Sequence, residues 1–93
     1  MNPELGPYVQ MGRLAEQMAT RYQIDPNLDL EPLVQHFMDE VEVNVAADKF
    51  DHSGFMKNIR RPLKIAADAT SDPRRKEFLQ SVVDALSTRL EGI

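Results

Sequence analysis

The sequence predicts an all-α protein, a compact bundle of four helices that forms a single domain over residues 1–93. The main observation is that two segments carry apolar residues at the three- and four-residue spacing of one helical face. The first set is Leu30, Leu33, Val34, Phe37, Met38, Val41 and Val45. The second set is Phe78, Leu79, Val82, Val83, Leu86, Leu90 and Ile93. The length of 93 residues suits one modest core, and 42% apolar and 28% charged residues are ordinary values for a globular domain.

The first helix is predicted over about residues 7–22. Pro7 suits its first turn, where a missing backbone N–H has no helical partner. One apolar face follows, with Met11, Leu14, Ala15, Met18 and Tyr22. Gly12 lies inside this helix, at a cost of about 1 kcal/mol relative to alanine. Residues 25–27 have the composition of a turn, because Pro26 disfavours helical geometry at the residue before it.

The second helix is predicted over about residues 30–49, with Asp29 as its N-cap. A strand competes with it, because the valines within residues 41–45 alternate with polar residues. The helical spacing covers seven positions and the strand spacing only three, so we expect the helix.

The third helix is predicted over about residues 54–69, after a capping turn at residues 51–54. Its apolar face is thinner than the others and consists of Phe55, Ile59, Leu63 and Ala66. Pro62 removes a backbone donor and clashes with the carbonyl of Asn58. We therefore expect this helix to be kinked or split at Pro62.

The fourth helix is predicted over about residues 73–91. Asp72 suits the N-cap position and Pro73 the first helical position. Gly92 suits the position just after the helix end. The connections between the predicted helices are short, which favours antiparallel neighbours in a bundle.

The charge changes sign along the chain, although the net charge is only −4. Residues 23–51 contain eight acidic residues and one lysine, whereas residues 52–76 contain seven basic and two acidic residues. One explanation is that the two segments pack side by side and neutralise each other, and a related one is that two copies of the chain pair their opposite charges. A third is that one segment faces a partner of opposite charge. We expect the first explanation or its intermolecular form.

The basic residues form a candidate anion- or partner-binding surface: Lys57, Arg60, Arg61, Lys64, Arg74, Arg75 and Lys76. The run at 74–76 falls in the first turn of the fourth predicted helix, where cations oppose the helix dipole. We expect acidic residues of the segment 39–51 or an external anion to compensate for it. Asp39, Glu40 and Glu42 form a candidate acidic partner face.

No catalytic or metal-binding pattern is recognisable. His36 shares a helical face with Asp39 and Glu40, but a metal site needs further ligands and an acid–base pair needs a substrate pocket. The sequence contains no cysteine, which excludes disulfides and thiolate ligands. Phosphate-binding loops and hydrolase motifs are absent. We predict a protein that is not an enzyme and that holds neither a cofactor nor a metal.

These observations favour a small helical protein–protein interaction module that acts as an adaptor, regulatory or chaperone-like subunit and forms a homodimer. Val9, Val43 and Ile65 lie off the main apolar faces and predict exposed apolar patches that a partner would cover. The alternative is a nucleic-acid-binding regulator that uses residues 57–64 and 74–76, with the third and fourth helices as a helix–turn–helix. The acidic net charge argues against this alternative.

The sequence predicts a cytoplasmic protein without a membrane partner. The segment Met1–Glu4 lacks the pattern of a signal peptide, and no apolar run reaches the roughly 18 residues that span a bilayer. The lack of cysteine suits a reducing compartment.

Overall fold

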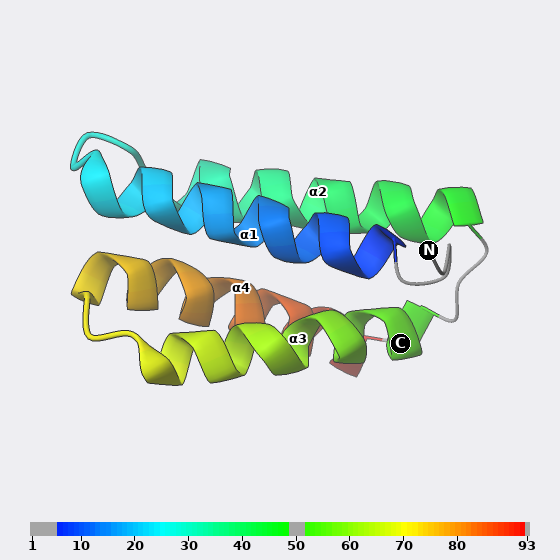
Figure 1. Cartoon of the computed structure of the whole chain (residues 1–93). Helices are drawn as coiled ribbons and strands as arrows, with labels where there is room; N and C mark the ends of the chain where they lie inside the picture. The colour runs from blue at the N-terminus through cyan, green and yellow to red at the C-terminus, as the bar shows by residue number, and fades with distance from the viewer. Residues whose placement is uncertain (1–5, 49–51, 93) are drawn as a thin grey trace.

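Four α-helices lie in two layers, and each layer is built from two antiparallel helices that follow each other in sequence (Figure 1). The structure is a computed structural model that describes residues 6–48 and 52–92. The helices are α1 (Gly6–Ile24), α2 (Leu30–Asp48), α3 (His52–Ala69) and α4 (Pro73–Glu91). The predicted four-helix bundle is confirmed, and the described residues contain no strand. Some positions used in the sequence predictions lie outside the described residues: position 49, residue 51 of the capping turn, Met1–Glu4 and Ile93.

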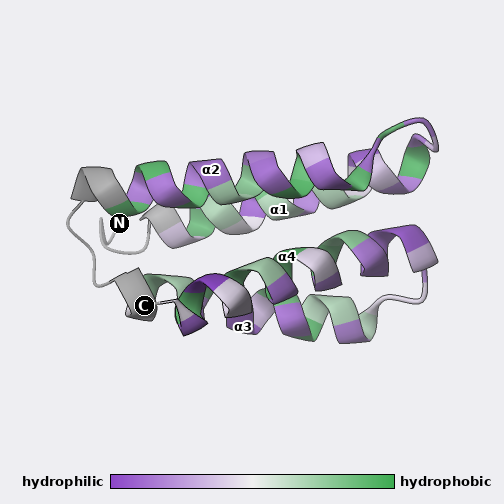
Figure 2. Ribbon diagram, turned by 180° about the vertical axis from the view of Figure 1, so that it is seen from behind, coloured by the Kyte–Doolittle hydropathy of each residue, from purple (hydrophilic) through white to green (hydrophobic). Residues whose placement is uncertain are grey.

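The core is formed by apolar side chains from all four helices. Figure 2 shows hydrophobic residues on the facing sides of the helices and hydrophilic residues on the outside. The largest fully buried side chains include Phe37, Phe55, Phe78, Met11, Met56, Leu79 and Leu86. No charged or polar residue among the described ones is buried. Burial of this apolar surface is the main force that holds the bundle together.

The valines of α2 show why the helical pattern prevails over the strand pattern. Val41 and Val45 are buried, with 0% and 1% of their surface exposed, whereas Val43 is 61% exposed. Residues four apart lie on the same face of a helix, and a residue two positions from each lies on the opposite side. The alternation of valine and polar residues therefore places one valine on the outside of the bundle.

The third helix is not split, because α3 is one continuous helix with Pro62 inside it. Pro62 and Asn58 are both exposed. The carbonyl that loses its helical hydrogen bond at this proline is therefore open to water, which lowers the cost of the missing bond. The apolar residues on the opposite face of α3 are buried and hold the helix in place: Phe55, Met56, Ile59, Leu63 and Ala67.

The start of α4 agrees with the sequence prediction. The backbone N–H of Arg75 donates to Oδ1 of Asp72 over 2.9 Å, so Asp72 is the N-cap, and Pro73 follows at the first helical position. This geometry satisfies one of the free N–H groups of the first turn. At the other end, the N–H of Gly92 donates to the carbonyls of Thr88 and Arg89.

The described acidic side chains of α2 and the basic side chains of α3 do not pack side by side, contrary to the first explanation of the charge pattern. The acidic residues belong mostly to α2 and the basic residues to α3, and these two helices lie diagonally across the bundle (Figure 1). Among the described side chains, no ion pair joins α2 to α3. The two opposite charges are therefore separated in space as well as in sequence.

Candidate functional site

The seven predicted basic residues separate into two groups instead of forming one surface. Arg74 and Arg75 bond to α1, whereas Lys57, Arg60, Arg61 and Lys64 line a groove with the second half of α4. Lys76 is exposed. The expectation of one continuous basic surface is therefore wrong.

Arg74 caps the carboxyl end of α1. Its Nε donates to the carbonyl of Tyr22 over 2.6 Å, and its Nη2 donates to the carbonyl of Asp25 over 2.9 Å. Its guanidinium carbon also lies 3.8 Å from the centroid of the Tyr22 ring. The carboxyl end of a helix has free carbonyls and a partial negative charge, so it attracts a cation. The compensation for Arg74 therefore comes from the carboxyl end of α1 and from Asp25, and among the described side chains it does not come from residues 39–45.

The neighbouring residues extend this contact between α1 and α4. Arg75 forms an ion pair with Glu16 and donates to Oγ1 of Thr20 over 3.2 Å. The hydroxyl of Tyr22 donates to Oε1 of Glu77 over 2.7 Å. This hydrogen bond, followed by burial, raises the pKa of Tyr22 above its ordinary value of 10.0. These basic residues of α4 stabilise the fold and are not free to hold a partner.

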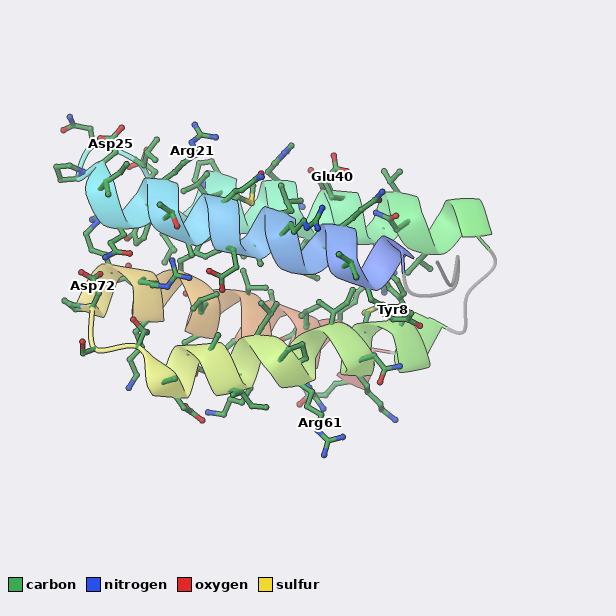
Figure 3. All side chains as sticks on the ribbon, in the orientation of Figure 1. Tyr8, Arg21, Asp25, Glu40, Arg61 and Asp72 are labelled. Atoms are coloured by element: carbon green, nitrogen blue, oxygen red, sulfur yellow. The ribbon has the colours of Figure 1, made fainter. Side chains whose placement is uncertain are left out.

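The remaining basic residues form a stripe along the outer face of α3. Lys57, Arg60, Arg61 and Lys64 follow the i, i+3, i+4, i+7 spacing of one helical face. They line an open groove of about 610 Å³ together with Asn58, Ile65, Val83 and Ser87. Arg61 points away from the bundle in Figure 3. Lys57 and Arg61 have no ion pair or side-chain hydrogen bond with any described residue. This groove, the α3–α4 groove, is the candidate site.

Arg60 differs from its three neighbours because it is held in place. Its Nη1 donates to Oγ of Ser87 over 3.1 Å, and the Ser87 hydroxyl donates to the carbonyl of Val83 over 2.9 Å. Arg60 therefore links α3 to α4, and both Arg60 and Ser87 line the groove. Lys64 forms an exposed ion pair with Asp68 over 3.2 Å, a type of pair that contributes little to stability. The groove thus combines one fixed arginine with three cations that can adjust.

The predicted acidic face lies on the outside of α2. Asp39 accepts a hydrogen bond from Nε2 of Gln35 over 2.8 Å, and Glu40 points away from the bundle in Figure 3. Glu42 instead turns toward α4, where Nε of Arg89 donates to its Oε1 over 2.6 Å. This contact raises the pKa of Arg89 above its ordinary value. Asp39 and Glu40 are therefore the members of the acidic face that point to solvent.

Each charged face has an exposed apolar side chain in it. Val43 is 61% exposed and lies one helical turn after Asp39 and Glu40. Ile65 is 64% exposed and lies one turn after Arg61. The predicted exposure of Val9, Val43 and Ile65 is confirmed. Ile24 at the end of α1 is 73% exposed as well, although the sequence pattern did not predict its exposure.

The other features are less specific. His36 is exposed, and within residues 6–48 and 52–92 no three His, Asp or Glu side chains lie close enough to hold a metal ion. A second groove of about 540 Å³ lies between α1 and α3 and includes Val9, Gly12 and Pro62. It is mostly apolar and lacks the charge pattern of the α3–α4 groove.

Comparison with known protein families, curated protein sequences and solved structures found no match for this chain. In the described part of the chain, none of the helices has the length and apolar character needed to cross a bilayer.

Proposed function

We propose that this protein is a non-enzymatic, cytoplasmic protein-binding module that holds an acidic protein segment in the α3–α4 groove. The observation that carries the proposal is the position of Lys57, Arg61 and Lys64 on one outward face around the exposed Ile65. Lys57 and Arg61 form no ion pair with a described residue, and Lys64 forms only the exposed ion pair with Asp68. Cations around an exposed aliphatic side chain suit a partner with carboxylates around an apolar contact.

Two observations favour a protein partner over a nucleic acid. Arg74 and Arg75 are engaged by α1, so only residues 57–64 remain of the basic surface that a nucleic acid would need. The groove also offers apolar Ile65 and Val83 and no aromatic side chain on which a base would stack.

The arrangement of α3 and α4 also differs from a helix–turn–helix. The two helices run antiparallel and side by side (Figure 1). The helices of a DNA-binding helix–turn–helix cross at roughly 90–120°. This difference further favours a protein partner.

The proposal is tested by capture of partners with charge-reversed variants. The test variant is Lys57→Glu, Arg61→Glu and Lys64→Glu, which leaves Arg60 and its bond to Ser87 intact. The matched control is Arg13→Glu, Arg21→Glu and Lys76→Glu, an equal change of charge at exposed positions elsewhere. Both variants should show the helical circular dichroism of the unmodified protein.

We expect the unmodified protein and the control to retain one specific protein partner from an extract of the source cells, and the test variant to lose it. Binding of duplex or single-stranded oligonucleotides at low salt, lost in the test variant alone, would instead support the nucleic-acid alternative. Equal capture by all three proteins would contradict the proposal.

A further inference from the structure

The acidic face of α2 has two features that suit the α3–α4 groove, namely negative charge and an exposed aliphatic side chain. The helix α2 contains five acidic residues and neither lysine nor arginine, whereas α3 contains four basic residues and one acidic residue. The bundle keeps these helices diagonally apart, and no ion pair joins them among the described side chains. A face that would neutralise the groove is therefore present on every copy of the chain.

The α2 face and the groove match in the positions of their exposed apolar residues as well as in charge. On α2, Val43 is preceded one turn earlier by Asp39 and Glu40. On α3, Ile65 is preceded one turn earlier by Arg61, with Lys64 beside it. Both faces thus present one aliphatic side chain with charges on the amino-terminal side. Pairing them buries Val43 against Ile65 and places the carboxylates among the cations.

We propose that the partner held in the α3–α4 groove is the α2 face of a second copy of this chain. The inference depends on the proposed function, because it identifies the occupant of the same groove. The contact is small, since each side contributes one helix face, so we expect weak and salt-sensitive association.

The positions of the two faces determine the type of assembly. Glu40 and Arg61 point away from the bundle on opposite sides in Figure 3. When one copy places its α2 face on a neighbour's groove, its own groove remains open on its far side. Such a contact is head-to-tail, and it produces chains or rings instead of a closed two-fold dimer.

The test uses two variants that each remove one face. The groove variant is Lys57→Ala, Arg61→Ala and Lys64→Ala, and the acidic-face variant is Asp39→Ala and Glu40→Ala. Asp39, Lys57, Arg61 and Lys64 are exposed, and the half-buried Glu40 points away from the bundle in Figure 3, so both variants should fold. The control is Arg13→Ala, Arg21→Ala and Lys76→Ala. Sedimentation equilibrium at low ionic strength gives the mass over a range of concentrations.

We expect the mass of the unmodified protein and of the control to exceed that of a dimer as concentration rises, and to fall when salt is added. Each face variant alone should associate about tenfold more weakly. An equimolar mixture of the two face variants should form a one-to-one pair and nothing larger, because each retains one intact face.

Several outcomes would overturn the inference. Unmodified protein that stays monomeric at millimolar concentration would do so, as would assembly that stops at a dimer or a mixture that forms no pair. If self-association is absent but partner capture still depends on Lys57, Arg61 and Lys64, the proposed function stands and only the second copy is wrong. If neither property depends on these residues, both proposals are wrong.

Discussion

The two groups of basic residues have opposite roles, although both come from the segment 52–76. At the start of α4, Arg74 and Arg75 bond to carbonyls, a hydroxyl and a carboxylate of the α1 region. On α3, Lys57 and Arg61 remain on the outer surface. The difference arises because the carboxyl end of α1 lies against the start of α4, whereas none of the described helices covers the outer face of α3. What surrounds a cation decides whether it stabilises the fold or is available to a partner.

The largest effect on stability is expected from Arg74→Ala. The change removes two charged hydrogen bonds to the end of α1 and the contact with the Tyr22 ring. We expect the free energy of unfolding to fall by roughly 2–3 kcal/mol, measured by urea denaturation. The exposed neighbour provides the control, because Lys76→Ala should change stability by less than about 0.5 kcal/mol. Equal effects of the two substitutions would remove the distinction between the groups.

Arg74→Lys tests whether the shape of the guanidinium matters as well as its charge. A lysine keeps the cation, but its single ammonium lacks the planar fork that reaches two carbonyls at once. We expect a loss of about 1–2 kcal/mol in the same urea measurement. Full retention of stability would mean that charge alone accounts for the contact.

Tyr22→Phe removes the hydroxyl that bonds to Glu77 and should cost about 1 kcal/mol at neutral pH. The pKa of Tyr22 is raised in the folded protein, so its protonated form favours folding. This contribution is complete below the unfolded pKa of 10.0 and is lost as the pH rises through the folded value. Unfolding free energies at about pH 9 and about pH 11 should therefore fall less in the variant than in the unmodified protein. The same fall in both proteins would contradict this role of Tyr22.

The smallest effect on stability is expected for the basic residues of α3. Arg61→Ala with Lys64→Ala should change the free energy of unfolding by less than about 0.5 kcal/mol, because both side chains are exposed. A loss of more than about 1 kcal/mol would show that these cations belong to the fold and are not available to a partner.

The fold was largely predictable because it depends on local spacing. The apolar faces of residues 30–45 and 78–90 determine which sides of two helices are buried, and Asp72 with Pro73 defines where the last helix begins. The sequence left open whether α3 is kinked or split at Pro62, and tertiary structure excludes the split: burial of the opposite face holds α3 together, and the exposed side tolerates the lost hydrogen bond.

The site was predictable only in part. The stripe of four basic residues on α3 can be recognised from its helical spacing, and the exposure of Ile65 from its position off the apolar face. The role of Arg74 as a cap at the end of α1 could not be predicted from spacing. Its acceptors, the carbonyls of Tyr22 and Asp25, lie about 50 residues earlier in the chain. Backbone carbonyls carry no sequence signal, so only the arrangement of the helices identifies such a contact.

The short connection at residues 70–72 has a consequence for the folding pathway. It joins α3 and α4, which pack against each other more extensively than any other pair of helices. Contacts that are close in sequence form fastest, so we expect this hairpin to be ordered in the transition state and α1 to dock later. Leu79→Ala should then slow refolding, whereas Met11→Ala should mainly accelerate unfolding, as stopped-flow kinetics would show.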